Sequence, residues 1–175
     1  MPNKIEIRIG GHGGQGIVLA GQILGRAAAY DRRKVLQTQA YGAEARGSLA
    51  KSEVIISDDK ISFPAVRKCD VLVAMNQEAL DVYIGSLKED GILLVDSSNV
   101  TNVPQTKAKV FKVPATQVAK ENFGNAMFAN MVMLGALTKV TKIVSEKSME
   151  KSIKETVQQK TVEANLNAFR KGLQT

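Results

Sequence analysis

Short runs of aliphatic and β-branched residues alternate along the chain with longer segments in which apolar residues return every third or fourth position. The first pattern is typical of strands buried in a sheet, and the second is typical of amphipathic helices. We therefore expect strands at residues 4–9, 35–38, 49–57, 71–75, 92–95 and 110–113, and a further hairpin strand at 61–63 before Pro64.

The expected helices lie between these strands and after the last of them. They cover residues 17–30, 77–87, a segment that begins at Pro114, 127–140, a segment that begins at Ser145, and a last segment after a break near Thr161. Residues 127–140 are apolar almost all round, so this helix is expected to be buried. Strands that alternate with helices predict an α/β fold with a mostly parallel sheet and C-terminal helices, in a single domain over residues 1–175.

The chain is basic, with a formal net charge of +7. A basic chain can bind nucleic acid, but many of the lysines lie between Lys139 and Lys171, where they alternate with glutamates as on a solvated helix face. No nucleic-acid motif accompanies the charge. We expect the charge to serve solubility, and we expect no nucleic acid among the partners.

Cys69 is the single cysteine. One thiol cannot form an intrachain disulfide or hold an iron–sulfur cluster, which needs several thiolates, so we expect a small residue that leads into a strand, and no bound metal. The most apolar stretch, 131–137, is far shorter than the ~20 residues that span a bilayer, and no signal-peptide segment follows Met1. The expected location is cytoplasmic, with no membrane partner.

Residues 10–16, Gly-Gly-His-Gly-Gly-Gln-Gly, separate the first expected strand from the first expected helix. Gly11, Gly13 and Gly16 match the glycine fingerprint of dinucleotide-binding loops, in the strand-to-helix context that this fingerprint requires. Glycines let the backbone approach a ligand closely, and free N–H groups at a helix start favour an anion such as a phosphate. The alternative is that these glycines only allow the strand and the helix to pack tightly.

The rest of the dinucleotide pattern is missing. NAD-binding folds of this type place an Asp or Glu about 20 residues further on to hold the ribose hydroxyls, whereas residues 35–39 read Val-Leu-Gln-Thr-Gln. No Lys-Ser or Lys-Thr follows the loop, so it is not a Walker A site. His12, the only histidine, is expected either to contact a phosphate or reacting group or, as the simpler interpretation, to have no catalytic duty.

A second unusual segment, Tyr41-Gly42-Ala43-Glu44-Ala45-Arg46-Gly47-Ser48, follows the second expected strand. Ligands gather at such positions in open α/β sheets. Arg46 could bind a carboxylate or a phosphate through two parallel hydrogen bonds. The alternatives are an internal pair with Glu44 and plain exposure to solvent.

Together these segments resemble the gamma subunit of 2-oxoacid:ferredoxin oxidoreductases, and the likeness covers nearly the whole chain. It rests on residues 11–16, 19–21, 41–47, 52–57, 70–73, 76–79, 130–135, and 165–169 followed by Gly172. Ala43 and Ser48 depart from the family pattern, which often has Pro and Gly at these positions.

The resemblance implies a Rossmann-like three-layer domain within an enzyme that oxidatively decarboxylates a 2-oxoacid to an acyl-CoA, CO2 and reduced ferredoxin. Thiamine diphosphate and iron–sulfur clusters then belong to the alpha, beta and ferredoxin-like subunits, and ferredoxin is the acceptor. This chain is implied to bind none of these cofactors alone, to be inactive by itself, to pack against those subunits and to engage coenzyme A. Likeness along the chain favours the 2-oxoglutarate type over the pyruvate, branched-chain and indolepyruvate types.

Two groups of site residues follow for this chain, neither of them catalytic. An anion- or cofactor-binding loop is expected at Gly11, His12, Gly13, Gly14, Gln15 and Gly16. A loop that faces the active site or a partner subunit is expected at Tyr41, Gly42, Glu44, Arg46 and Gly47. From the residues alone, two other functions stay open: a stand-alone nucleotide-binding or regulatory module, and a structural subunit that binds no ligand.

Overall fold

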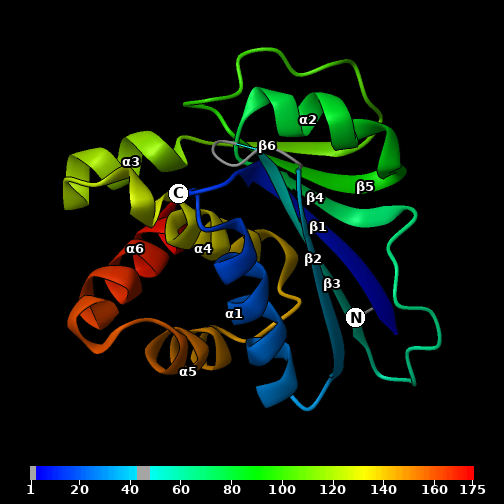
Figure 1. The fold of residues 1–175 in the computed structure, drawn as a ribbon, viewed down its shortest axis with the longest axis horizontal. Helices are drawn as coiled ribbons and strands as arrows, with labels where there is room; N and C mark the ends of the chain where they lie inside the picture. Colours follow the sequence, from blue (N-terminus) through cyan, green and yellow to red (C-terminus); the bar gives the residue numbers. More distant parts are fainter. Residues whose placement is uncertain (1–2, 43–47) are drawn as a thin grey trace.

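A six-stranded sheet forms the middle layer of the computed structural model, which describes residues 3–42 and 48–175 (Figure 1). The strands are β1 (Lys4–His12), β2 (Lys34–Tyr41), β3 (Leu49–Ser57), β4 (Cys69–Ala74), β5 (Leu87–Asp96) and β6 (Lys109–Val113). Their order is β2-β3-β1-β4-β5-β6, and β3 runs opposite to the other strands of the described sheet. The expected α/β fold with a mostly parallel sheet is confirmed.

Helices cover both faces of this sheet. They are α1 (Ile17–Tyr30), α2 (Gln77–Tyr83), α3 (Ala115–Phe123), α4 (Ala129–Thr141), α5 (Glu146–Thr156) and α6 (Val162–Gln174), with single 3-10 turns η1 (Ile84–Ser86), η2 (Ala126–Phe128) and η3 (Gln159–Thr161). In Figure 1, α1 and the C-terminal helices lie on one side of the sheet and α2 lies on the other. The three-layer arrangement and the C-terminal helices are therefore confirmed.

The two faces of the sheet have separate hydrophobic cores. The larger core joins the sheet to α1, α4, α5 and α6, and the smaller one lies under α2 and the loops around Val66 and Val100. Residues 129–138 of α4 are all buried, which confirms the expected buried helix. Burial on every side explains why its sequence lacks a polar face.

The parallel strands end at one edge of the sheet. Gly10 of β1 pairs with Ala74 of β4, which pairs with Val95 of β5, so the loops that follow these strands lie side by side. Open α/β sheets bind ligands at the carboxyl ends of their strands. This carboxyl edge is where the glycine loop emerges.

The structure corrects several expected boundaries. β1 extends through His12, because Gly10, Gly11 and His12 continue the antiparallel ladder with β3, and β2 extends to Tyr41 for the same reason. The glycine loop is therefore shorter than residues 10–16. The expected strand at 61–63 is wrong, since these residues have no strand structure and Phe63 is half exposed. Helix α2 ends at Tyr83, because Leu87 already belongs to β5, where it pairs with Cys69.

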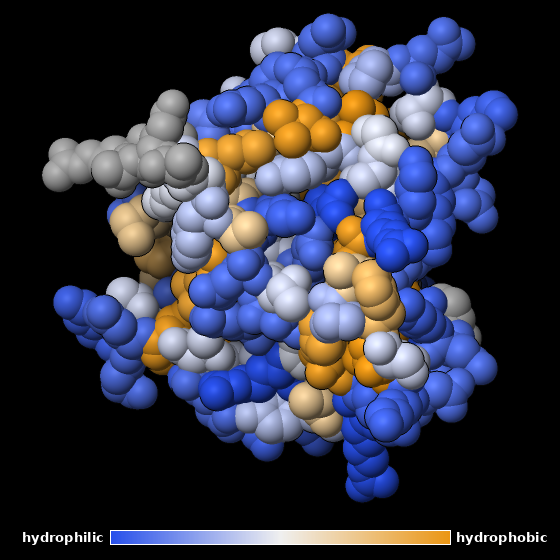
Figure 2. Space-filling model, turned by 45° about the vertical axis from the view of Figure 1, so that its right-hand side comes forward, coloured by the Kyte–Doolittle hydropathy of each residue, from blue (hydrophilic) through white to orange (hydrophobic). Residues whose placement is uncertain are grey.

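No helix among the described residues is long and apolar enough to cross a lipid bilayer. Hydrophilic residues dominate the face drawn in Figure 2, and apolar side chains form separate patches between them. Large apolar side chains exposed within the described ranges are Tyr41, Phe63, Val82 and Met127.

Candidate functional site

The glycine loop leaves β1 at His12 and enters α1 at Ile17. Its backbone is left-handed at Gly14 (φ 94°) and again at Gly16 (φ 71°), the residue that caps α1. Residues with a Cβ rarely adopt positive φ, so both positions favour glycine. A Cβ built on Gly14 would meet no atom within 4 Å, so the loop is open to a ligand at that point.

Several N–H groups of the loop are already hydrogen-bonded within the chain. Gly13 N–H donates to the Ser48 carbonyl (2.9 Å) and Gln15 N–H donates to the His12 carbonyl (3.1 Å). The His12 N–H donates to the side-chain oxygen of Gln15 (2.7 Å). Among the described residues, the N–H groups of Gly14, Gly16 and residues 17–19 at the start of α1 are the ones left to face an anion. Fewer loop N–H groups are therefore free to bind an anion than the glycine motif alone would suggest.

Two of the fingerprint glycines are explained by packing. A Cβ on Gly11 would lie 2.5 Å from Ile17 Cδ1 and 2.7 Å from Gln15 Oε1. A Cβ on Gly16 would lie 2.2 Å from Asn130 Nδ2. Close packing therefore favours glycine at Gly11 and Gly16, while Gly13 and Gly14 are the exposed members of the loop.

His12 lies at the carboxyl end of β1, where its Nε2 is 2.6 Å from Oε2 of Glu78 in the first turn of α2. The sequence did not predict this partner. Both side chains are substantially exposed, and exposed pairs of this kind add little stability. The pair nevertheless sets the orientation of the imidazole ring beside the open part of the loop.

The second predicted segment begins beside the glycine loop. Tyr41 ends β2 and is 59% exposed, and Gly42 N–H donates to the Leu49 carbonyl (2.8 Å), which closes the β2–β3 hairpin. The bond from Gly13 to Ser48 links the two segments directly. Ala43, Glu44, Arg46 and Gly47 lie outside the described residues.

Polar residues at the ends of β4 and β5 complete this edge, and the sequence reasoning missed them. Asn76 caps α2 by accepting a hydrogen bond from Ala79 N–H (2.8 Å). Asp96 is fully buried and accepts from the Thr116 hydroxyl (2.5 Å) and the Ser98 N–H (3.1 Å). The available signal was a polar residue that directly follows an apolar strand.

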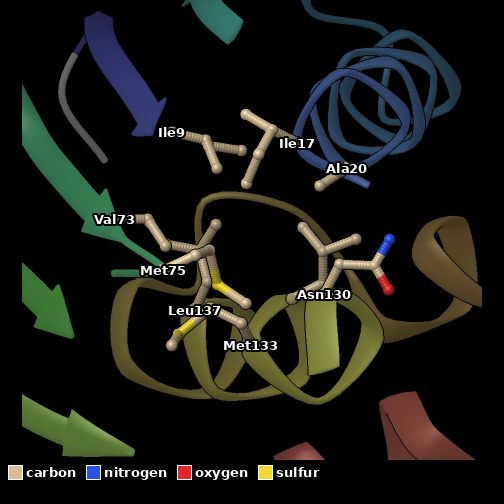
Figure 3. Close-up of a pocket in the computed structure, with 9 residues that line it drawn as sticks. Ile9, Ile17, Ala20, Val73, Met75, Asn130, Met133 and Leu137 are labelled. Atoms are coloured by element: carbon tan, nitrogen blue, oxygen red, sulfur yellow. The ribbon is translucent and has the colours of Figure 1, made fainter. Parts of the chain in front are cut away.

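An apolar cavity of about 10 Å³ lies beneath the loop, large enough for one water molecule at most. It is lined mainly by Ile9, Ile17, Val73, Met133 and Leu137 (Figure 3). Such a void cannot hold a cofactor. It is a packing gap between the sheet, α1 and α4.

The described residues do not fit an iron–sulfur cluster. They contain no group of three or more His, Cys, Asp or Glu side chains placed to hold a metal. Cys69 is buried, with its Sγ donating to the Ser86 carbonyl (3.5 Å), and burial raises the pKa of its thiol. A buried, protonated thiol is a poor metal ligand.

Residues 6–175 match the protein family described as pyruvate ferredoxin/flavodoxin oxidoreductase. The 2-oxoglutarate synthase subunit KorC of Methanocaldococcus jannaschii is 52% identical over 170 residues, which cover 95% of this chain and 91% of that subunit. The pyruvate synthase subunit PorC of Methanothermobacter marburgensis is 37% identical over 170 residues, covering 95% of this chain and 94% of that subunit.

Solved structures show the same arrangement. The gamma subunit of a keto/oxoacid ferredoxin oxidoreductase from Geobacter sulfurreducens is 43% identical and superposes with a TM-score of 0.87, covering 97% of this chain and 96% of that one. A 2-oxoglutarate:ferredoxin oxidoreductase from Magnetococcus marinus, with 2-oxoglutarate, coenzyme A and succinyl-CoA bound, is 27% identical with a TM-score of 0.90. The match covers 99% of this chain and 31% of that longer one.

Proposed function

We propose that this chain, which belongs to the pyruvate ferredoxin/flavodoxin oxidoreductase family, is the gamma-type subunit of a 2-oxoglutarate:ferredoxin oxidoreductase. This proposal rests mainly on sequence similarity over nearly the whole chain. The chain is 52% identical to a 2-oxoglutarate synthase subunit and 37% identical to a pyruvate synthase subunit. The complete enzyme would convert 2-oxoglutarate and coenzyme A to succinyl-CoA and CO2 and would reduce ferredoxin.

The chemistry of such an enzyme falls to other subunits. The alpha, beta and ferredoxin-like subunits would carry thiamine diphosphate and the iron–sulfur clusters, because the described residues of this chain offer no ligand set for a cluster. Thiamine diphosphate, where bound, supplies the carbanion chemistry of decarboxylation. This chain would contribute binding and orientation. The similarity supports this role over that of a stand-alone nucleotide-binding or regulatory module.

The glycine loop is the part of this chain that we assign to coenzyme A. The exposed Gly13 and Gly14 let a phosphate approach the backbone, and the Gly14 and Gly16 N–H groups with the positive end of the α1 dipole favour its charge. Helix α1 begins without an acidic residue in its first turn, so no carboxylate of that turn competes for these donors. The absence of an acid in β2 argues against NAD as the ligand.

The second segment would face the active site or a partner subunit. Tyr41 is exposed at the carboxyl edge, and the hydrogen bond from Gly13 to Ser48 brings the base of the segment beside the glycine loop. We assign to this segment a charge-assisted contact made by Arg46, together with contacts from Gly42, Glu44 and Gly47. Aromatic residues and arginines are enriched in protein interfaces.

The test uses the enzyme assembled with its co-expressed partner subunits. We expect a higher kcat/KM for 2-oxoglutarate than for pyruvate, and a Gly13→Val variant whose KM for coenzyme A rises about tenfold, which is about 1.4 kcal/mol. A Cβ on Gly13 meets only Ser48 O at 3.7 Å, so the fold tolerates the change.

The matched control is Gly85→Val, because Gly85 lies in η1, outside the glycine loop, and a Cβ there has no neighbour within 4 Å. A preference for pyruvate would overturn the substrate assignment. A Gly13→Val enzyme that assembles normally and keeps its KM for coenzyme A within about twofold would exclude a contact of this size.

A further inference from the structure

Four side-chain amides form hydrogen bonds to the glycine loop or to the chain beside it. Gln15, Asn76, Asn99 and Asn130 come from the loop itself, from the start of α2, from the segment after β5 and from α4. Asn76 and Asn130 are buried, with 8% and 4% of their surface exposed. We call these residues the carboxamide brace.

Gln15 is the centre of the brace. Its Oε1 accepts hydrogen bonds from the His12 N–H (2.7 Å) and from Asn76 Nδ2 (3.0 Å), while its Nε2 donates to the Met75 carbonyl (3.2 Å). The side chain therefore folds back over Gly11, where a Cβ would collide with it. This geometry turns Gln15 away from the ligand side and ties the loop to the end of β4.

Asn99 extends the brace to the next strand. Its Nδ2 donates to the same Met75 carbonyl (3.3 Å), to Thr116 Oγ1 (2.9 Å) and to Asp96 Oδ2 (3.1 Å). Asp96 is fully buried and also accepts from the backbone at the start of α3. A continuous hydrogen-bond network thus runs from the glycine loop to α3.

Asn130 holds the other end of the loop. Its Nδ2 donates to the Gly16 carbonyl (3.3 Å) and fills the space where a Cβ of Gly16 would lie. In Figure 3 the amide of Asn130 points away from the apolar side chains of the cavity. The residue that caps α1 is therefore fixed from α4.

We propose that the carboxamide brace is a positioning device for the anion site of the glycine loop. It fixes the directions of the Gly14 and Gly16 N–H groups, and because amides are neutral the side chains of the brace themselves add no charge beneath the anion. A carboxylate in the same place would repel a phosphate, and an ammonium group would attract it to the wrong side. The proposal rests on the function assigned above to the loop.

The test compares Gln15→Met and Gln15→Glu in the assembled enzyme. Methionine keeps the length of the side chain but forms none of the three hydrogen bonds of Gln15. Glutamate can still accept from His12 N–H and Asn76, loses the bond to Met75 and adds a charge. The control is Gln77→Met, which removes similar bonds to Thr101 N–H and Asn102 N–H at the same edge.

Hydrogen exchange of the peptide spanning residues 9–17 tests the brace by itself. In Gln15→Met the His12 N–H loses its acceptor, so exchange should be faster, whereas Gln77→Met should leave this peptide unchanged. Unchanged exchange in Gln15→Met overturns the brace, whatever the kinetics show.

Kinetics test the link to the ligand. For both Gln15 variants the KM for coenzyme A should rise about fivefold or more, with the KM for 2-oxoglutarate changed by less than about twofold. The ratio of the Gln15→Glu KM to the wild-type KM should fall as salt is added, because ions screen its charge, and the Gln15→Met ratio should not. Faster exchange with every KM unchanged would show that the loop does not hold the coenzyme, and would overturn the positioning role together with that assignment.

Discussion

Arg8 and Glu53 form an ion pair inside the sheet, between β1 and β3. Arg8 Nη2 lies 2.6 Å from Glu53 Oε1, and each side chain is 8% exposed. Arg8 also donates to the Val66 carbonyl (2.6 Å) and lies over the ring of Tyr83. A buried charge that keeps all its partners is tolerated, whereas removal of one partner leaves an uncompensated charge.

The pKa of the Glu53 carboxyl reflects two opposing effects, burial and hydrogen bonding. Burial would raise it, but hydrogen bonds from Lys51 and Arg8 outweigh burial and hold the pKa below its usual value. The ionised carboxylate therefore stabilises the fold above the ordinary pKa of about 4.3. This contribution is lost as the pH falls through the lower pKa of the folded state.

We predict that Arg8→Met destabilises the chain by about 3 kcal/mol at pH 7, because Glu53 remains buried with Lys51 as its ionic partner. The double variant Arg8→Met/Glu53→Leu should recover much of the loss. Urea unfolding at pH 7 measures both, and a repeat near pH 4 should show a smaller gap between wild type and Arg8→Met. An Arg8→Met chain as stable as wild type would contradict the prediction.

At the scale of elements, α4 and α6 cross with their backbones in contact. A Cβ on Gly135 of α4 would lie 2.1 Å from the Phe169 carbonyl oxygen, and one on Gly172 of α6 would lie 1.9 Å from the Val132 carbonyl oxygen. Backbone atoms cannot move aside as a flexible side chain can, so any larger residue must force the helices apart.

Gly135→Ala should therefore destabilise the chain by about 2 kcal/mol, as overpacking of a dense core does. The sign of this change in unfolding free energy is informative, because in a free helix the same substitution would stabilise by about 1 kcal/mol. Gly85→Ala serves as the control, because nothing lies within 4 Å of a Cβ there. The denaturant midpoint measures both, and a stabilised Gly135→Ala variant would show that the two helices separate freely.

At the scale of the whole molecule, the structure suits a subunit of a larger enzyme. Its carboxyl edge gathers the glycine loop, the start of the second segment and the carboxamide brace, while its described residues include no set of ligands for a metal cluster. We propose that the electron carriers which the family activity needs lie on the partner subunits.

We expect the purified chain alone to be colourless and to contain no stoichiometric iron. It should not reduce ferredoxin with 2-oxoglutarate and coenzyme A until the partner subunits are added. Iron analysis, the visible absorption spectrum and a ferredoxin-reduction assay check this. Stoichiometric iron in the isolated, folded chain would refute it.

Local periodicity was sufficient to predict most elements from the sequence. The predicted helix at 17–30 and the strand at 49–57 have the observed bounds of α1 and β3, because each carries its own apolar pattern over many residues. The glycine motif also placed the loop between a strand and a helix. The family resemblance, which depended on several separated motifs, was confirmed by the match over residues 6–175.

Only the tertiary structure decided which strands pair and which distant residues are in contact. β1 extends through His12 because Leu49 pairs with it, and a single-sequence pattern cannot show that Gly10 and Gly11 belong to a ladder rather than to a loop. Asn130, 114 positions away from Gly16, fills the space where a Cβ of residue 16 would lie. Such contacts depend on the path of the whole chain, whereas periodicity records only which side of its own element each residue faces.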